Sequence, residues 1–282
     1  MNEKHPTVLV LGATGKTGFR VTAELAHRGV PVRTAARSGA DVDFDWNDRG
    51  SYAPALKAVD RVYLIAPIGR LDFADDVSAF LDEAEAAGVR HVTFLSAYGM
   101  EHAPREVATR GVELDLLGRE RLDHTILRPA WFMQNFSETF LKPVDGAIAV
   151  PTGSGAEAFI DVEDIAAVAA ATLADPAPHI GAAYSLTGPV SLTVAEAAAI
   201  ISEAVGRTIV HRDLDRDAWI DGAIANGIPA EYAAVLRQLT ETIASGNGSR
   251  PLDTVEQVTG TPARAFGDFA RRNAAAWTEA SK

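Results

Sequence analysis

Two hydrophobic patterns alternate along the first half of the chain. Short unbroken apolar runs, such as residues 7–11, are typical of strands buried on both faces, and amphipathic stretches, such as residues 19–28 before Gly29, are typical of helices. The same patterns predict strands at 30–36, 61–66, 90–96 and 125–127, and helices at 52–58, 73–87 and 105–117. Strands that alternate with helices predict an α/β fold with a doubly wound parallel sheet covered on both faces.

The pattern changes after Pro129. Residues 131–136 are rich in aromatic and amide side chains, one short strand follows at 184–186, and helices dominate the rest. The expected helices occupy residues 161–173, with Asp161 as the N-cap, 194–205, 217–225, 232–243 and 263–277. We therefore expect a nucleotide-binding domain at 1–129 and a smaller, mainly helical substrate-binding region at 130–282, of which about 155–190 pack back on the first domain.

Composition narrows the classes of function. The 282 residues carry a formal net charge of −12, which argues against binding to nucleic acid or to an anionic membrane surface. The absence of cysteine excludes disulfide frameworks, thiolate metal sites and cysteine nucleophiles, and the His, Asp and Glu spacings show no metal-binding pattern. No stretch approaches the roughly 20 apolar residues that a membrane span needs, and no apolar signal segment precedes the first strand, so we expect a cytoplasmic protein.

A glycine-rich turn, GATGKTG at residues 12–18, connects the first expected strand to the first expected helix. Three glycines at a spacing of three allow a tight turn, the close approach of a pyrophosphate and tight packing of the helix on the strand. A phosphate-transferring P-loop would need another glycine at position 10, which is Val10. The turn therefore predicts a dinucleotide site lined by Gly12, Thr14, Gly15, Lys16, Thr17 and Gly18.

The end of the second strand bears on which nucleotide binds. An acidic residue there binds the ribose of NAD, whereas an arginine accommodates the additional phosphate of NADP. Arg37, followed by Ser38, is the best-placed cation, so the sequence favours NADP(H), while Asp41 or Asp43 on a different loop path keeps NAD(H) open. The other expected cofactor contacts, near the adenine and past the next strand, are Asp45, Trp46, Ala66 and Pro67. Packing of the tryptophan ring in the core is an equal alternative to a contact with adenine.

Six short motifs, spread over most of the chain, occur together: GATGKTG at 12–18, FLSA at 94–97, TILRP at 125–129, FMQN at 132–135, DVEDIA at 161–166 and YSLTGP at 184–189. In this set and order, the chain resembles the NmrA-like group of atypical short-chain dehydrogenases/reductases, which includes type 2 NAD(P)H:quinone oxidoreductases. The resemblance implies a Rossmann domain, NAD(P) bound across the strand ends and a substrate cleft under a small C-terminal region.

The usual catalytic pair of short-chain dehydrogenases is missing. Enzymes of that class that reduce ordinary carbonyls place a lysine four residues after a tyrosine, and none of the 5 tyrosines has one. The lysine that type 2 quinone reductases carry before the Leu-Arg-Pro strand is also absent from residues 112–117. A quinone needs less help from a proton donor, because the charge that it accepts spreads over an aromatic oxyanion.

We therefore expect an NAD(P)H-dependent oxidoreductase that reduces a quinone-like or conjugated aromatic small molecule by hydride transfer. The resemblance alone implies that the substrate is a polyketide-type quinone of aromatic secondary metabolism. It also implies that the product enters a hydroxylation or monooxygenation step. Tyr98 and His102 form the best local proton-donor pair, and Ser96 is expected near the nicotinamide ribose or the substrate oxygen. We expect a flat apolar cleft with orienting amides, or else hydrophobic packing between the two regions, from Trp131, Phe132, Met133, Gln134, Asn135 and Phe136.

A second class of function stays open on the sequence. Without the Tyr/Lys pair, the chain also fits a regulatory protein that senses NADP and binds a protein partner without turnover. The aromatic and amide-rich segment after Pro129 favours the enzyme. The expected partners of the enzyme are its small-molecule substrate and either an oxygenase that uses the product or further copies of the chain.

Overall fold

The computed structural model describes residues 6–67 and 69–278, and the chain folds into two units. Unit 1 comprises Met1–Pro129, Val162–Leu186 and Gln257–Gly260, and unit 2 comprises the remaining segments, Ala130–Asp161, Thr187–Glu256 and Thr261–Lys282. Neither unit is one continuous stretch of sequence, because the chain returns to unit 1 twice.

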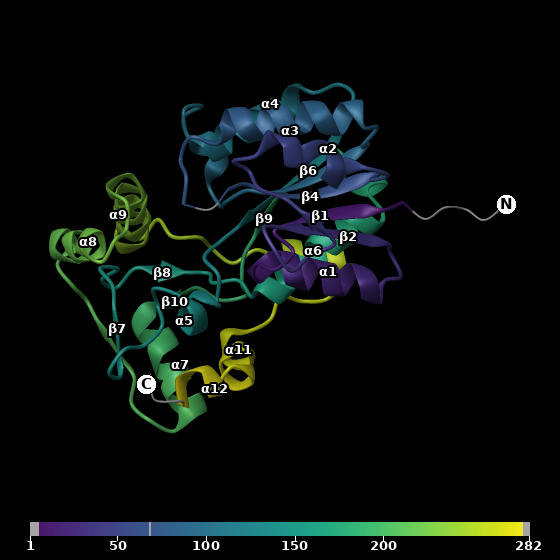
Figure 1. Ribbon diagram of the computed structural model, residues 1–282. Helices are drawn as coiled ribbons and strands as arrows, with labels where there is room; N and C mark the ends of the chain where they lie inside the picture. Colours follow the sequence, from purple (N-terminus) through teal and green to yellow (C-terminus); the bar gives the residue numbers. More distant parts are fainter. Residues whose placement is uncertain (1–5, 68, 279–282) are drawn as a thin grey trace. The chain divides into compact units, whose positions relative to one another are not determined.

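A seven-stranded parallel sheet forms the centre of unit 1 (Figure 1). The strand order is β3-β2-β1-β4-β5-β6-β9, and every neighbouring pair runs parallel. The strands are β1 (Val8–Leu11), β2 (Val32–Ala36), β3 (Val42–Asp43), β4 (Arg61–Ile65), β5 (His91–Leu95), β6 (Asp123–Pro129) and β9 (Ala183–Leu186). The order reverses its direction between β1 and β4, which confirms the predicted doubly wound, Rossmann-like fold class.

Helices cover both faces of this sheet, because parallel strands need crossover connections. Helices α1 and α6 pack together on one face, and α2, α3 and α4 lie on the other (Figure 1). The helices are α1 (Lys16–His27), α2 (Tyr52–Leu56), α3 (Ala74–Ala86), α4 (Ala108–Gly118) and α6 (Val162–Ala174), with 3-10 turns η1 (Arg49–Ser51), η2 (Met100–His102) and η3 (Ala177–His179). Strand β1 is buried on both faces as a result, as its unbroken apolar run predicts.

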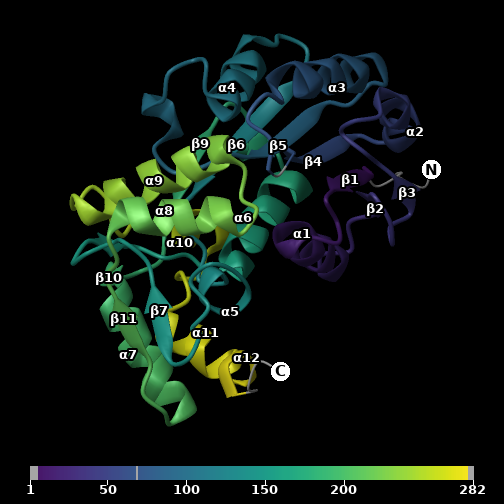
Figure 2. The same ribbon diagram turned by 60° about the vertical axis from the view of Figure 1, so that its left-hand side comes forward.

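Unit 2 combines helices with two small two-stranded sheets. Strand β8 pairs with β10, β7 pairs with β11, and α8 and α9 lie side by side (Figures 1 and 2). The elements are α5 (Asn135–Glu138), β7 (Ala147–Ala149), β8 (Ala156–Glu157), β10 (Leu192–Thr193), α7 (Val194–Val205), β11 (Val210–Arg212), α8 (Arg216–Ala225), α9 (Ala230–Ala244), α11 (Phe266–Arg272) and α12 (Ala275–Thr278). Helix α10 (Thr254–Thr259) contains residues of both units. Strands of two or three residues are too short to show an alternating pattern, so the sequence did not predict them.

The single helix predicted at 263–277 is wrong, because the chain forms two helices, α11 and α12, with a turn between them. Asn273 ends α11, where its side-chain amide donates to the carbonyl of Phe269 at 2.9 Å. The indole Nε1 of Trp277 donates to the carbonyl of Phe136 at 2.7 Å and holds α12 on α5. A local hydrogen bond at the end of α11 and a tertiary contact from α12 therefore override the continuous apolar pattern.

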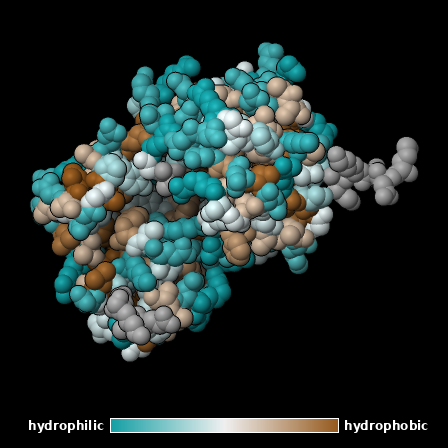
Figure 3. Space-filling model, viewed as in Figure 1, coloured by the Kyte–Doolittle hydropathy of each residue, from teal (hydrophilic) through white to brown (hydrophobic). Residues whose placement is uncertain are grey.

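The part of the chain that the structure describes contains no helix long and apolar enough to cross a membrane. Hydrophilic side chains are spread over the face drawn in Figure 3, and hydrophobic ones occur between them.

A buried histidine lies at the start of β5 in unit 1. His91 is 2% exposed, and its Nε2 lies 3.2 Å from Oγ1 of Thr125. That hydroxyl donates to the carbonyl of His179 at 2.8 Å, so it can only accept from His91, and Nε2 must carry the ring proton. Nδ1 has no hydrogen-bond partner among the described residues. Burial, followed by the nearby cation of Arg61, lowers the pKa of His91 to about 3.

We expect the free energy of unfolding to decrease as the pH is lowered from 7 to 5. Unfolded His91 takes up a proton near pH 6.5, whereas folded His91 does so only near pH 3, so the stabilisation is complete above pH 6.5 and is lost toward acid. Its share of the loss between pH 7 and pH 5 is about 2 kcal/mol. Urea titrations of the wild type and of His91→Gln at both pH values measure this share. An identical pH dependence in the two proteins would mean that His91 is not held neutral.

Candidate functional site

The turn between β1 and α1 depends on two glycines. Gly12 has a φ of +61°, a left-handed conformation that glycine adopts at little cost, and its carbonyl accepts from the Gly15 N–H at 2.8 Å. At Gly18, a Cβ atom would lie 2.2 Å from the Gly12 carbonyl oxygen. Only glycine at position 18 therefore allows α1 to pack this closely on the end of β1.

The N-terminus of α1 suits a pyrophosphate. Its N-cap is Gly15, which makes no side-chain cap, and no acidic residue lies in its first turn. Free N–H groups and the positive end of the helix dipole at this place attract an anion. Thr14 and Gly15 are exposed beside it, whereas Thr17 is 5% exposed and belongs to the packed side of the turn. The turn thus has the shape and the charge that a dinucleotide needs.

The loop after β2 carries the expected cation to this turn. Arg37 and Ser38 are exposed, and a Cβ atom on Gly39 would lie 3.7 Å from Cγ2 of Thr14, so the loop lies against the glycine turn. Arg33 is engaged elsewhere, because its guanidinium donates to the carbonyls of Lys57 and Pro54 at 3.2 and 3.1 Å. Among the described residues, Arg37 makes no side-chain hydrogen bond or ion pair, so it is available to a ligand.

Asp41, one of the two acids that kept NAD(H) open, closes the same loop. Its Oδ2 accepts from the backbone N–H and the hydroxyl of Thr34 at 2.9 and 2.8 Å. The backbone hydrogen bond, followed by the hydroxyl bond, lowers the pKa of Asp41 below its usual value. Its carboxylate is therefore ionised and tied to β2, where it holds the loop that carries Arg37.

The remaining predicted cofactor residues lie further along the sheet. The Trp46 ring packs edge-on against Phe44 and Phe80, and its centroid lies 5.0 and 5.5 Å from theirs. This arrangement favours packing of the ring in the core, and a contact with adenine stays a prediction. Asp45 accepts from the backbone and the side chain of its neighbour Asn47. Ala66 and Pro67 directly follow β4, which neighbours β1 where the strand order reverses, the position at which open parallel sheets bind ligands.

A buried ionic network that the sequence analysis missed lies at the end of β5. The Ser96 hydroxyl donates to Oε1 of Glu113 at 2.6 Å, and Arg128 donates to both carboxylate oxygens at 2.9 Å. Arg110 adds a further bond to Oε2 at 2.6 Å. Glu113 is 0% exposed and shares the buried face of α4 with Val112 and Leu116. An acidic residue on the apolar face of a predicted helix is the signal that could have identified it.

The predicted proton-donor pair lies just beyond the same strand. The Tyr98 N–H donates to the carbonyl of Pro129 at 3.0 Å, and His102 ends the η2 turn. Both side chains are exposed, and no hydrogen bond joins them in the part of the chain that the structure describes. Their catalytic role stays a prediction.

The residues of the predicted substrate segment, 131–136, fall into a buried set and a partly exposed set. Met133, Gln134 and Phe136 are at most 2% exposed, and the Gln134 amide donates to Oδ1 of Asp161 at 2.7 Å. All three are buried in unit 2, and their contact with a substrate stays a prediction. The partly exposed residues Trp131, Phe132 and Asn135 are the ones that we retain as candidates for contact with a substrate.

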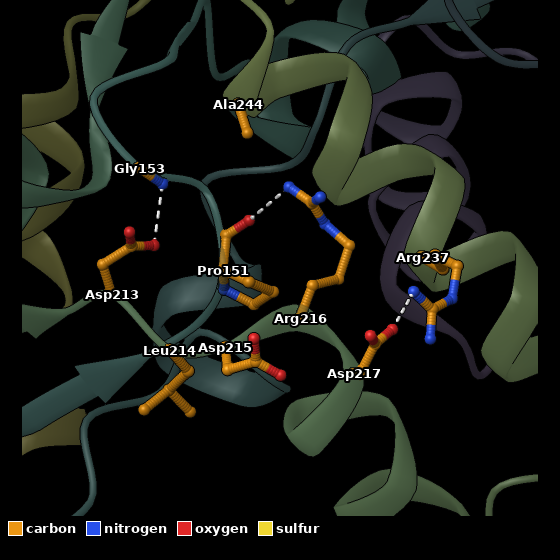
Figure 4. A pocket seen from close by; sticks show the side chains of 9 residues that line it. All are labelled: Pro151, Gly153, Asp213, Leu214, Asp215, Arg216, Asp217, Arg237 and Ala244. Atoms are coloured by element: carbon orange, nitrogen blue, oxygen red, sulfur yellow. Dashed lines mark hydrogen bonds and ion pairs between the residues drawn. The ribbon is translucent and has the colours of Figure 1, made fainter.

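Unit 2 also contains an open pocket of about 370 Å³, which the sequence did not predict (Figure 4). Most of the labelled side chains around it are charged, and they engage other protein groups. Arg237 pairs with Asp217 at 2.5 Å, Arg216 donates to the carbonyl of Pro151 at 3.3 Å, and Asp213 accepts from a backbone N–H. Such a lining is unsuited to a flat apolar substrate. Within the described ranges, no group of His, Asp and Glu side chains is arranged to hold a metal.

Comparisons with known proteins show the family to which the chain belongs. Residues 12–176 match the model of a family described as NAD(P)H-binding. The chain is 38% identical to the uncharacterized oxidoreductase YesF of Bacillus subtilis, over 98% of both chains. It is 30% identical to festuclavine synthase II of Penicillium roqueforti and 30% identical to NAD(P)H azoreductase of Xenophilus azovorans, in each case over 96% of this chain and 99% of the other.

Solved structures share the fold. The NADPH-dependent quinone oxidoreductase QOR2 of Escherichia coli, in complex with NADPH, has a TM-score of 0.78 at 22% identity, over 94% of this chain and 99% of that one. NmrA, a negative transcriptional regulator in complex with NAD, has a TM-score of 0.77 at 15% identity, over 95% of both chains. These likenesses confirm the fold that the motifs at 12–18 and 125–129 led us to expect.

We expect Gly18→Ala to raise the Kd for NADPH about tenfold or more, because the new Cβ would force α1 away from the Gly12 carbonyl. Gly118→Ala is the matched control, since that glycine ends α4 in open space. Titration calorimetry measures both Kd values, and thermal unfolding shows whether either variant is folded. Unchanged nucleotide binding by a folded Gly18→Ala protein would contradict the assignment of this turn.

Proposed function

We propose that this chain, which belongs to the NAD(P)H-binding family and is an NAD(P)H-dependent oxidoreductase, transfers hydride from NADPH to a quinone-like or conjugated aromatic small molecule. The observation that carries the choice of nucleotide is the exposed Arg37 on a loop that lies against an uncapped glycine turn. A planar guanidinium beside that turn suits the additional phosphate of NADP.

The acids near Arg37 support the same choice. Asp41 is hydrogen-bonded to Thr34, so it does not extend toward a ribose in the manner of an NAD-selective acid. Asp43 ends the short strand β3 and is exposed, and Ser38 adds a hydroxyl next to the cation. Because Asp41 is engaged by Thr34 and Arg37 is available, we infer a preference for NADP(H) over NAD(H).

The proposed substrate class follows from the proton chemistry. Bound NADPH supplies a hydride, and a quinone needs one further proton to reach the hydroquinone. We assign that proton to the Tyr98 hydroxyl or to the His102 imidazole, both exposed beyond β5 and without the lysine that an alkoxide-forming reductase uses. Trp131 and Phe132 supply aromatic surface for a planar substrate, and Asn135 supplies an amide to orient its oxygen.

The relatives support a conjugated substrate and a secondary-metabolic setting. One is named for the reduction of azo compounds and another for the synthesis of festuclavine, and a protein with the same fold is named as a quinone oxidoreductase. We place the reaction in aromatic secondary metabolism, in the cytoplasm, where a hydroxylation or monooxygenation step consumes the product and its oxygenase is a candidate partner.

We expect Arg37→Asp to weaken NADPH binding about 30-fold or more and NADH binding less than threefold, because a charge reversal acts mainly on the ligand with the additional phosphate. Arg121→Asp, an exposed charge reversal in the same unit before β6, is the matched control. Fluorescence titration of both reduced nucleotides measures the four Kd changes. Equal losses for NADPH and NADH would show that Arg37 does not select the nucleotide.

We expect NADPH oxidation to proceed with simple benzoquinones and naphthoquinones, with a kcat/KM about tenfold or more above that for aliphatic ketones of similar size. The reason is that a quinone oxyanion needs little proton donation, which this chain is poorly equipped to provide. Absorbance at the nicotinamide band follows the reaction. Faster turnover of the ketones, or nucleotide binding without turnover of any quinone, would contradict the proposed substrate class.

A further inference from the structure

Ser96 directly follows β5, and both of its hydrogen-bond donors, the backbone N–H and the hydroxyl, already have acceptors in the protein. Its backbone N–H donates to the carbonyl of Leu127 at 2.8 Å, and its hydroxyl donates to Oε1 of Glu113 at 2.6 Å. We propose that Ser96 serves as a hydrogen-bond acceptor for an N–H or O–H group of the bound nucleotide, and that Glu113 and Arg128 are the positioning residues that set this polarity. The inference rests on the proposed function, because it concerns the same nucleotide.

The state of Glu113 decides the direction of the Ser96 hydrogen bond. Burial by itself would raise the pKa of this carboxyl, but hydrogen bonds from Arg128, Ser96 and Arg110 outweigh that effect and hold the pKa below its usual value. Glu113 is therefore ionised at neutral pH and can only accept hydrogen bonds. The single proton of the Ser96 hydroxyl consequently points to Glu113.

The geometry around Glu113 leaves it little freedom. Arg128 binds it with two parallel bonds at 2.9 Å, from Nε to Oε1 and from Nη2 to Oε2. The same guanidinium lies 3.4 Å from Glu101 of η2, so the network joins β6, α4 and the turn that follows Tyr98. A paired carboxylate that cannot rotate keeps Ser96 in one orientation.

What remains on Ser96 is a pair of acceptor sites on Oγ, and the side chain is 8% exposed. A quinone or ketone oxygen is itself an acceptor, so it gains nothing from this serine. A pyridine nucleotide offers two kinds of donor, the carboxamide NH2 group and the ribose hydroxyls. Ser96 follows β5, which neighbours β4, so it belongs to the edge of the sheet at which such ligands bind. The sequence left open whether Ser96 contacts the nucleotide or the substrate oxygen. This assignment favours the nucleotide.

The experiment compares Ser96→Ala, Ser96→Thr and the wild type in binding NADP+ and its 3-acetylpyridine analogue, in which a methyl group replaces the carboxamide amine. Titration calorimetry on the full chain measures each Kd. We expect Ser96→Ala to raise the Kd for NADP+ about fivefold to tenfold. Ser96→Thr keeps the hydroxyl and should keep the Kd of the wild type. The KM of both variants for a quinone should stay within twofold of the wild-type value. If the donor is the carboxamide, Ser96→Ala leaves the Kd of the analogue unchanged; if it is a ribose hydroxyl, both Kd values rise equally. An unchanged Kd for NADP+ together with a raised quinone KM would overturn the proposal.

A double-mutant cycle tests the role of Glu113. Glu113→Gln keeps the shape of the side chain but replaces one carboxylate oxygen by an amide NH2 group. With that group against Ser96, the hydroxyl no longer donates to residue 113 and its proton is free to turn toward the nucleotide. We therefore expect the Kd for NADP+ to rise by a factor similar to that for Ser96→Ala. In a Ser96→Ala background the same change should add no further loss, whereas a purely structural role would give losses that multiply. If Glu113→Gln fails to fold, the two Ser96 variants still decide the proposal. A wild type that binds no pyridine nucleotide would refute the proposed function itself, whereas a wild type that binds NADP+ with a Kd indifferent to Ser96→Ala refutes this inference alone.

Discussion

The proposed nucleotide site of unit 1 depends on one close approach, that of Gly18 to the carbonyl oxygen of Gly12. No side chain fits there, since a Cβ atom would lie 2.2 Å from the oxygen. The approach brings the uncapped N-terminus of α1 to the place where the strand order reverses, and the loop that carries Arg37 lies against the same turn through Thr14. The fold and the proposed ligand site thus depend on the same contact, because the turn that allows the helix to pack on β1 also places the N-terminus of α1 beside the loop that carries Arg37.

The two ends of β5 show how burial leads to opposite charge states. At the amino end, His91 has one nitrogen without a partner, so a second ring proton would find no acceptor and the ring stays neutral. At the carboxyl end, Glu113 is as deeply buried, but three side chains donate to it and the carboxylate stays ionised. Burial opposes the charged form at both positions, and the hydrogen bonds that Glu113 receives are what allow it to keep its charge. The ionised group lies at the edge of the sheet where ligands bind, and the neutral one at the opposite edge.

Unit 2 uses half of its aromatic segment for its own stability. Phe136 packs edge-on against Phe159 and Phe266, with centroids 4.9 and 5.0 Å apart, and Gln134 engages the buried carboxylate of Asp161, which Arg272 also binds. Neighbours in sequence therefore differ in burial: Met133, Gln134 and Phe136 are buried, whereas Trp131, Phe132 and Asn135 are partly exposed. The partly exposed Trp131, Phe132 and Asn135 are the residues of this segment that we propose for contact with a substrate.

The sequence by itself determined the alternating strands and helices of unit 1 and the glycine turn between β1 and α1, because each depends on residues that are close together in the chain. The parallel sheet could be predicted from that alternation, since a strand, a crossover helix and a further strand run parallel. It did not reveal that Glu113 binds Ser96 and Arg128, that Gln134 binds Asp161, or that 263–277 breaks into two helices. The two side-chain pairings join residues 15 or more positions apart, and the break in 263–277 involves the distant contact of Trp277 with Phe136. A local pattern can show that Glu113 lies on an apolar helix face, but it does not show which partners such a residue finds. Only the tertiary structure decided which buried polar groups find partners, and so which of them stay charged, because a side chain's hydrogen-bond partners are set by the packing of distant elements.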